Sequence, residues 1–313
     1  MLVILSGGTG TPKFLNGLTE VLPAHEICII TNTADDFYFY GLRVCPDLDS
    51  VLYVLAGLLD KTKWWGLEGD TYWVRDALNV FREDIWFNLG DKDLALSLLR
   101  TNLLAHGKTL SETTEILSKR LGITQLVLPM TNELVQTYIS TTVGRLHFQE
   151  WWVKHKGQPT ILEIEFEGIN EATPSEKVIE SIQNADAVIV GPSNPVTSIG
   201  PILSVSGIRS ALEELEVPVL AISPFIGTKS ISGPAGTLLS AQNLPIHSNV
   251  LIRLYKGFLD ALLVDPRDIP TMNCENKKIH IIGRNTIMKS RREEIDLARD
   301  VLRFLRKISP IRR

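Results

Sequence analysis

The residue pattern best suited to chemistry is a glycine-rich loop near the start of the chain, Ser6-Gly7-Gly8-Thr9-Gly10-Thr11-Pro12-Lys13. The apolar segment 2–5 before it predicts a strand, and apolar residues at helical spacing over 14–18 predict a helix after it. Glycines let main-chain N–H groups converge on an anion, and the start of a helix adds a favourable dipole. The pattern therefore predicts a diphosphate site. It matches neither the Walker motif nor the full dinucleotide fingerprint.

The loop offers both main-chain and side-chain donors to such an anion. The residues predicted to contact phosphate are Gly7, Gly8, Thr9, Gly10 and Thr11. Lys13 would add a positive charge, and the threonine hydroxyls can donate hydrogen bonds to phosphate oxygens. A tight turn that only starts a helix is the alternative interpretation.

Paired aspartates, Asp47 and Asp49, follow a proline just ahead of an apolar helix. Carboxylates at positions i and i+2 cannot share a helix face, but where a helix begins one can cap while the other projects. Asp49 is the preferred metal ligand, because Mg²⁺ takes hard oxygen donors and commonly uses one or two protein carboxylates beside substrate phosphates. Helix capping is the alternative. The aspartates at 35–36 and in the loop 88–93 can likewise be interpreted either as functional residues or as helix caps.

A polar, proline-rich segment over residues 191–201 follows a strongly apolar strand predicted at 187–190. Prolines fix its backbone, while Ser193 and Asn194 offer donors and acceptors at a strand end, where ligands of parallel sheets bind. The segment suits recognition of a base, a ribose or a phosphate. Residues 232–236 add a similar wall, although simple turn chemistry also explains either loop.

Aromatic residues cluster in or near polar loops, at 37–40, 64–65 and 72–73. A flat ring substrate could stack on them, with core packing as the alternative for any single residue. The six histidines show no metal-ligand spacing, and none is assigned a catalytic role.

Apolar segments define the elements that must position these loops. Strands are predicted at residues 2–5, 26–31, 126–128, 145–149, 161–166, 187–190 and 217–223. Short apolar strands separated by helical stretches favour parallel pairing with helices on both faces. The predicted fold is α/β, a Rossmann-like three-layer fold with a mostly parallel sheet. Residues 1–313 are predicted to form one unit, in which residues 50–125 are an inserted, largely helical layer.

Composition excludes several classes of function. A formal net charge of −4 argues against a general nucleic-acid binder, which needs a basic surface. Three widely spaced cysteines without a CxxC pair predict neither a disulfide framework nor a zinc site, so a reducing, cytoplasmic location is expected. No apolar run approaches the ~18 residues needed to span a bilayer, and no membrane partner is expected.

Taken together, the motifs resemble one known family. They lie at residues 6–13, 32–36, 46–49, 65–66, 89–93, 128–130, 191–195 and 233–235. Their order and spacing over nearly the whole chain are similar to those of the 2-phospho-L-lactate transferase family. The resemblance implies Mg²⁺-dependent transfer of a phospholactyl group, or its enolpyruvyl analogue, from a guanosine diphosphate-linked donor to the ribityl hydroxyl of a deazaflavin. GMP would be released, in the biosynthesis of coenzyme F420.

The resemblance also implies roles for individual residues. The glycine loop and Lys13 would hold the donor phosphates, and Ser193 and Asn194 would face the nucleotide. Asp49 would bind Mg²⁺ and orient the attacking hydroxyl. Three residues, Asp49, Trp65 and Asn88, would contact the deazaflavin. A homodimer is compatible with the sequence, which does not fix the oligomeric state.

Two features leave alternatives open. The resemblance to the family predicts an acidic pair after residues 128–131, but this sequence has Asn132-Glu133 there. Phe225–Thr228 likewise replaces the Gly-Gly ending that is more usual in the family. These departures leave the choice between lactyl and enolpyruvyl donors undecided. A non-catalytic regulatory protein that binds a nucleotide sugar, like the gluconeogenesis factors, would share the first loop and the segment 191–195. A nicotinamide-dependent oxidoreductase fits less well, because its fingerprint glycines are out of register.

Overall fold

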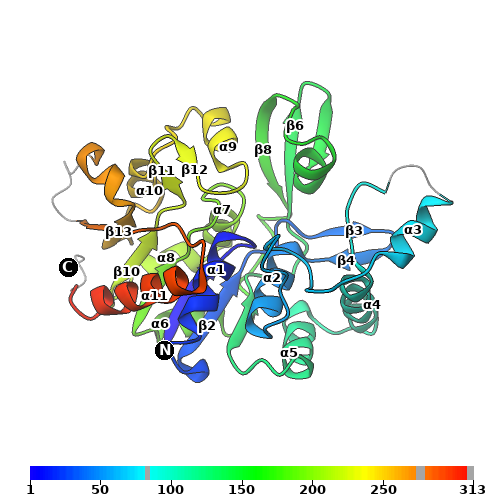
Figure 1. Cartoon of the computed structure of the whole chain (residues 1–313), viewed down its shortest axis with the longest axis horizontal. Helices are drawn as coiled ribbons and strands as arrows, with labels where there is room; N and C mark the ends of the chain where they lie inside the picture. The colour runs from blue at the N-terminus through cyan, green and yellow to red at the C-terminus, as the bar shows by residue number, and fades with distance from the viewer. Residues whose placement is uncertain (82–84, 273–278, 309–313) are drawn as a thin grey trace.

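The computed structural model describes residues 1–81, 85–272 and 279–308. At its centre lies a seven-stranded sheet in the order β14-β13-β10-β9-β1-β2-β5, in which each neighbouring pair is parallel (Figure 1). Its strands are β1 (Leu2–Ser6), β2 (Ile27–Thr31), β5 (Leu126–Pro129), β9 (Ala187–Val190), β10 (Val219–Ile222), β13 (Ala261–Val264) and β14 (His280–Gly283). The prediction of an α/β fold with a mostly parallel sheet is confirmed.

Two apolar cores cover the two faces of this sheet, because successive side chains of a strand point to opposite sides. In β1, Leu2 and Ile4 face one core and Val3 and Leu5 the other. The first core also takes residues from α1 (Gly10–Leu18), α2 (Pro46–Leu55), α5 (Leu110–Arg120) and α11 (Arg291–Leu305). The second takes residues from α6 (Val178–Gln183), α7 (Ile199–Ser204), α8 (Ile208–Glu213), α9 (Ala235–Ala241) and α10 (Asn249–Leu254). The result is a three-layer arrangement of helices, sheet and helices.

The strand order reverses at β1, which lies between β2 and β9. From β1 the chain first builds outward through β2 to β5, and then returns to β9 and builds the other way through β10, β13 and β14. Connections after β1 and β9 therefore leave toward opposite faces. In open parallel sheets a ligand crevice forms at such a switch point, outside the carboxyl ends of the strands.

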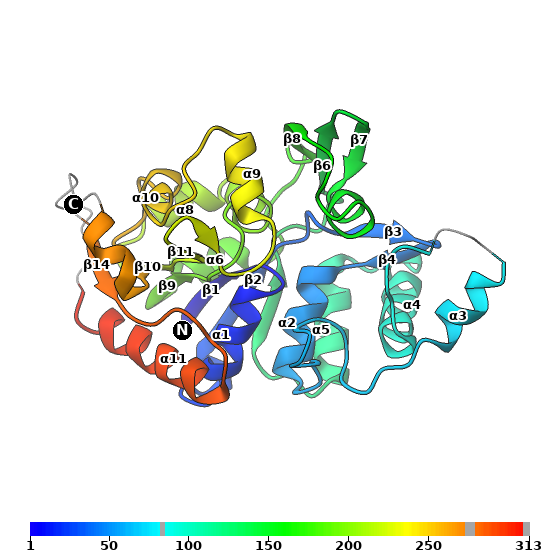
Figure 2. The same ribbon diagram turned by 45° about the horizontal axis from the view of Figure 1, so that its top comes forward.

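Two excursions from the sheet extend the molecule on the side of β2 and β5 (Figure 2). The first contains the antiparallel hairpin of β3 (Phe37–Phe39) and β4 (Leu42–Val44), followed by α3 (Trp73–Asn79) and α4 (Asp91–Ala105). The second is a small antiparallel sheet of β6 (Gln136–Thr141), β7 (Gly144–His147) and β8 (Ile161–Glu167). Of two segments predicted as strands, 161–166 falls within β8, whereas only residues 145–147 of the segment 145–149 lie in β7.

The segment 50–125 thus contains most of α2 and all of α3, α4 and α5. Both α2 and α5 contribute buried residues to a core of the central sheet, and α4 packs partly buried leucines against the same core as well as packing against β4. Short elements complete the chain: the 3-10 turns Ala24–Glu26 and Pro266–Thr271, the π-helical turn Glu150–Lys154, and the strands β11 (Phe225–Ile226) and β12 (Lys229–Ser230). None of the helices described is long and apolar enough to cross a membrane.

Candidate active site

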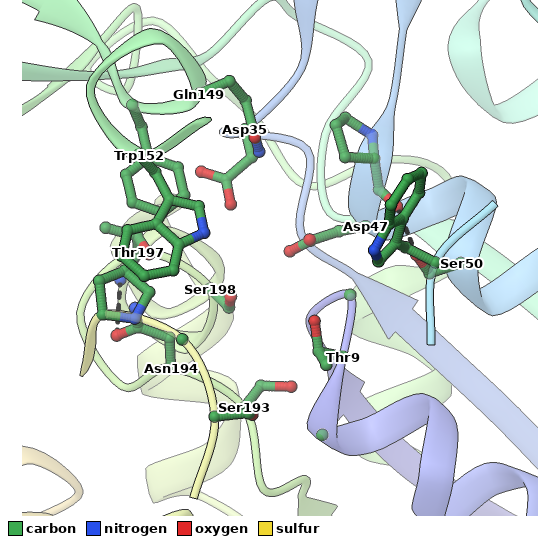
Figure 3. Close-up of a pocket in the computed structure, with 18 of the residues that line it drawn as sticks. Thr9, Asp35, Asp47, Ser50, Gln149, Trp152, Ser193, Asn194, Thr197 and Ser198 are labelled. Carbon is green, nitrogen blue, oxygen red and sulfur yellow. Dashed lines mark hydrogen bonds between the residues drawn. The ribbon is translucent and has the colours of Figure 1, made fainter. Parts of the chain in front are cut away.

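A cavity of about 450 Å³ opens at the carboxyl ends of β1 and β9. Its walls come from the glycine loop, the loop after β2, the start of α2, the segment after β7 and the loops before α7 and α9 (Figure 3). The lining residues are Gly8, Thr9, Gly10, Asp35, Pro46, Asp47, Ser50, Trp65, Phe87, Asn88, Phe148, Gln149, Trp152, Val153, Pro192, Ser193, Asn194, Thr197, Ser198, Pro224, Ser232, Gly233, Pro234 and Ala235. The cavity thus occupies the crevice that the strand order creates.

The glycine loop packs directly against the loop after β9. The Gly7 N–H donates to Ser193 Oγ at 3.1 Å, and the Thr11 and Ser193 hydroxyls are hydrogen-bonded at 2.7 Å. A Cβ at Gly10 would collide with the carbonyl oxygen of Pro192. Glycine is therefore required at position 10 by this close approach, and the two loops form one continuous floor.

Of the residues predicted to bind the donor, Gly8, Thr9, Gly10, Ser193 and Asn194 line the cavity. Gly7 and Thr11 lie behind this surface and hold Ser193 instead. Asn194 Oδ1 accepts the Val196 N–H at 3.0 Å, which fixes the turn that presents its neighbours.

Lys13 is not among the residues that line this cavity. Its Nζ lies 4.9 Å from the centre of the Trp64 ring, and burial lowers the pKa of the ammonium group. Lys13 lines a neighbouring cavity of about 230 Å³, together with Lys289. Both cavities share the wall residues Gly10, Pro192, Pro224 and Ser232, so they are adjacent.

Two carboxylates, Asp35 and Asp47, face the cavity and point toward one another in Figure 3. Asp47 Oδ2 accepts a hydrogen bond from Asn32 Nδ2 at 2.9 Å. Burial raises the pKa of Asp47 to about 7, against the hydrogen bond from Asn32, which lowers it. Asp35 Oδ1 is buried without a hydrogen-bond partner, and burial, followed by repulsion from Asp47, raises the pKa of Asp35. Such an oxygen pair is suited to a proton or a cation.

Asp49, the residue preferred as metal ligand from the sequence, lies elsewhere. It is not in the cavity lining, and its carboxylate is engaged on both oxygens by the guanidinium of Arg100, with Nη1 to Oδ2 at 3.1 Å. Arg100, on α4, is fully buried. Residues i and i+2 of a helix point to different sides, so the first turn of α2 turns Asp47 to the cavity and Asp49 to α4. A second buried ion pair joins Arg43 on β4 to Asp36, with Nη2 and Oδ2 2.9 Å apart.

Trp65 and Asn88, predicted to contact the deazaflavin, both line the cavity. Trp65 is 43% exposed, and Asn88 Oδ1 accepts a hydrogen bond from Arg75 Nη1 at 3.2 Å. The structure therefore brings Trp65 and Asn88 to the same cavity as Ser193 and Asn194, although they are far apart in the sequence.

Residues after β7 were missed by the sequence interpretation. Phe148, Gln149, Trp152 and Val153 line the cavity from the segment that ends the small antiparallel sheet. The signal available was the Trp151-Trp152 pair directly after a predicted strand, because exposed aromatic rings close to a strand end often serve binding.

Fold and site together define an α/β protein in which a glycine-rich loop and two acidic residues line a cavity at a topological switch point. A family model of 2-phospho-L-lactate transferase CofD matches residues 2–300. The chain belongs to the 2-phospho-L-lactate transferase family, and it is accordingly a transferase.

Two relatives support the family assignment, and a solved structure shows the shared fold. The chain is 39% identical to the 2-phospho-L-lactate transferase of Methanococcoides burtonii over 96% of this chain and 98% of the relative. It is 40% identical to the one of Methanococcus maripaludis, over 97% and 98%. A solved structure of a UPF0052 family member from Bacillus halodurans has a TM-score of 0.62 at 18% identity and covers 96% of this chain and 99% of that one, which shows a shared fold.

Proposed function

We propose that the protein transfers a phospholactyl group, or its enolpyruvyl analogue, from a guanosine diphosphate-linked donor to the ribityl hydroxyl of a deazaflavin in coenzyme F420 biosynthesis. Family membership supports a transferase. The observation that favours this substrate pair is that the glycine loop, the acidic pair Asp35 and Asp47, and the residues Trp65 and Asn88 all line the same cavity.

In the proposed reaction, the hydroxyl oxygen forms a bond to the phosphorus that carries the lactyl or enolpyruvyl ester. The bond from that phosphorus to the bridging oxygen breaks, and its electron pair leaves with GMP. The hydroxyl proton is released. Phosphoryl transfer depends mainly on positioning and on neutralising charge, and it needs no covalent protein group. Main-chain N–H groups of Gly8–Gly10 would orient the diphosphate, and Lys13 would add positive charge from the adjacent cavity.

The acidic pair fits Mg²⁺ better than Asp49 does. Asp35 Oδ1 has no hydrogen-bond partner and shares the cavity with Asp47, whereas the carboxylate of Asp49 is neutralised by Arg100. In the described part of the chain no three His, Cys, Asp or Glu side chains form a metal-binding group. Mg²⁺ commonly takes only one or two protein carboxylates and fills its other positions with water and phosphate oxygens. We therefore assign the ion to Asp35 and Asp47, where it would neutralise the charge of the diphosphate.

This assignment predicts how pH and Mg²⁺ act on stability. In the folded, metal-free protein the pKa of Asp47 is about 7, above the 3.8 of an ordinary aspartate. The folded state then binds more protons than the unfolded state, so this contribution to stability is present at low pH and is lost as pH rises through about 7. Because Mg²⁺ competes with the proton, the rise in melting temperature on adding Mg²⁺ should be larger at about pH 8 than at about pH 6.

Thermal unfolding with Mg²⁺ or EDTA at both pH values measures this effect. Asp47→Asn should lose most of the Mg²⁺-dependent rise. An equal rise at both pH values, retained in the variant, would contradict the assignment.

One assay tests the proposed function. The protein is incubated with Mg²⁺, the deazaflavin and a guanosine diphosphate-linked donor, either lactyl or enolpyruvyl, and GMP and the charged deazaflavin product are measured. Both products should appear together with at least one donor. Failure with every donor, alongside tight binding of a nucleotide sugar, would instead favour a regulatory binding protein.

A further inference from the structure

The segment after β7 places two neighbouring tryptophans in very different surroundings. It is a π-helical turn, Glu150–Lys154, a rare conformation that often occurs at functional sites. Trp151 is fully buried, whereas Trp152 is 38% exposed and lines the large cavity. An indole left partly open to a cavity retains apolar surface that a flat ligand can cover.

Trp151 anchors the turn. Its Nε1 donates to the carbonyl oxygen of Pro159 at 2.9 Å, and its ring stacks on Phe148 with centroids 6.2 Å apart. The Trp152 ring lies 6.1 Å from that of Trp151 at an interplanar angle of 32°. The Trp152 ring therefore lies beside a ring that is itself fixed, which limits how far the indole can move.

Gly157 closes the same turn from behind. Its φ of +64° is in the left-handed region, and its N–H donates to the carbonyl oxygen of Trp151 at 2.9 Å. A Cβ at this position would lie 3.2 Å from Cε3 and Cζ3 of Trp152. The backbone thus packs tightly behind the indole, which lies across the cavity from Asp47 and Thr9 in Figure 3.

We propose that Trp152 is a stacking surface that binds the planar heteroaromatic ring of a substrate. This inference rests on the proposed function, which supplies two such rings, the deazaflavin and the guanine base of the donor. Stacking on an aromatic side chain tolerates different rings because each presents a π-face. Trp152 would bind and position the substrate, because its indole side chain takes no part in the proposed phosphoryl transfer.

The test replaces Trp152 by leucine and by phenylalanine in the full chain. Trp152→Leu should raise the KM and the Kd of one planar substrate by about 10- to 100-fold, the range found for stacking on aromatic residues, with kcat changed by less than about threefold. Trp152→Phe should restore most of the affinity. Trp73→Leu is the matched control, because Trp73 is 77% exposed on α3 and lies outside the cavity lining.

Separate titrations identify which ring is bound. Deazaflavin binding is followed by its fluorescence, and GDP binding by calorimetry. A selective loss of deazaflavin affinity in Trp152→Leu assigns the acceptor, and a selective loss of GDP affinity assigns the donor base. Unchanged affinity for both, or an equal loss in Trp152→Leu and Trp152→Phe, would overturn the proposal.

The titrations also separate this proposal from the proposed function. If the wild-type protein transfers nothing but binds one ring in a Trp152-dependent manner, the transfer reaction fails and the stacking surface stands. If the wild-type protein binds neither ring, the stacking surface is refuted as well.

Discussion

Replacing Asp47 with asparagine is expected to lower kcat by about 100-fold or more, the usual loss when a group that stabilises charge in the transition state is removed. Asparagine has the same shape, and its carbonyl oxygen can still accept the hydrogen bond that Asn32 donates to Asp47. The variant also removes a carboxylate whose pKa burial raises, so its melting temperature at about pH 8 should equal or exceed that of the wild type.

Steady-state kinetics with saturating Mg²⁺, together with thermal unfolding, measures both effects. Ser50→Ala is a suitable control, because Ser50 lines the same cavity and its hydroxyl donates only to the carbonyl oxygen of Pro46 in its own helix, at 2.8 Å. A turnover number for Asp47→Asn within threefold of the wild type would remove Asp47 from the proposed metal site.

Asp49→Asn is expected to act on stability. Asp49 pairs with Arg100, whose side chain is fully buried, and an asparagine would leave the guanidinium charge there without compensation. Removing one partner of a buried ion pair typically costs about 3 to 5 kcal/mol in the free energy of unfolding. Denaturant unfolding at neutral pH measures this loss.

The double variant Asp49→Leu with Arg100→Met provides the matched comparison. Replacing both charges with apolar side chains of similar volume should recover most of the lost stability, because the desolvation cost of the pair disappears with it. If Asp49→Asn instead kept the wild-type free energy of unfolding and abolished turnover, Asp49 would be the metal ligand that the sequence favoured.

Much of the central sheet was accessible from sequence alone. The runs at 2–5, 26–31, 187–190 and 217–223 are short and apolar and end in glycine, proline or polar residues, which indicates buried parallel strands. By contrast, β13 and β14 were missed. Ala261–Val264 is a four-residue apolar run, and His280–Gly283 has only two large apolar residues, so periodicity cannot distinguish either segment from a buried helical turn. Only the pairing of β13 with β10 and of β14 with β13 shows that they are strands.

The sequence predicted which loops form the site, but not which side chains of those loops point into the cavity. The sequence placed the glycine loop and residues 193–194 at strand ends, where the cavity lies. It favoured Asp49 as the metal ligand, whereas the structure turns Asp47 to the cavity, because packing against α1 and β2 and the ion pair of Asp49 with Arg100 set the rotation of α2 about its axis. The same limit applies to Trp151 and Trp152, since the π-helical turn and its contacts decide which indole is buried.

The two buried ion pairs also limit how far this protein can be shortened. Arg43 and Arg100 belong to the first excursion, yet their partners Asp36 and Asp49 lie beside the two acidic residues of the cavity. A shortened chain that kept only the central sheet would leave the buried carboxylates of Asp36 and Asp49 without their positively charged partners. Engineers who delete α4 would therefore have to redesign position 49, and those who also remove the hairpin of β3 and β4 would have to redesign position 36, which makes the excursion an integral part of the scaffold.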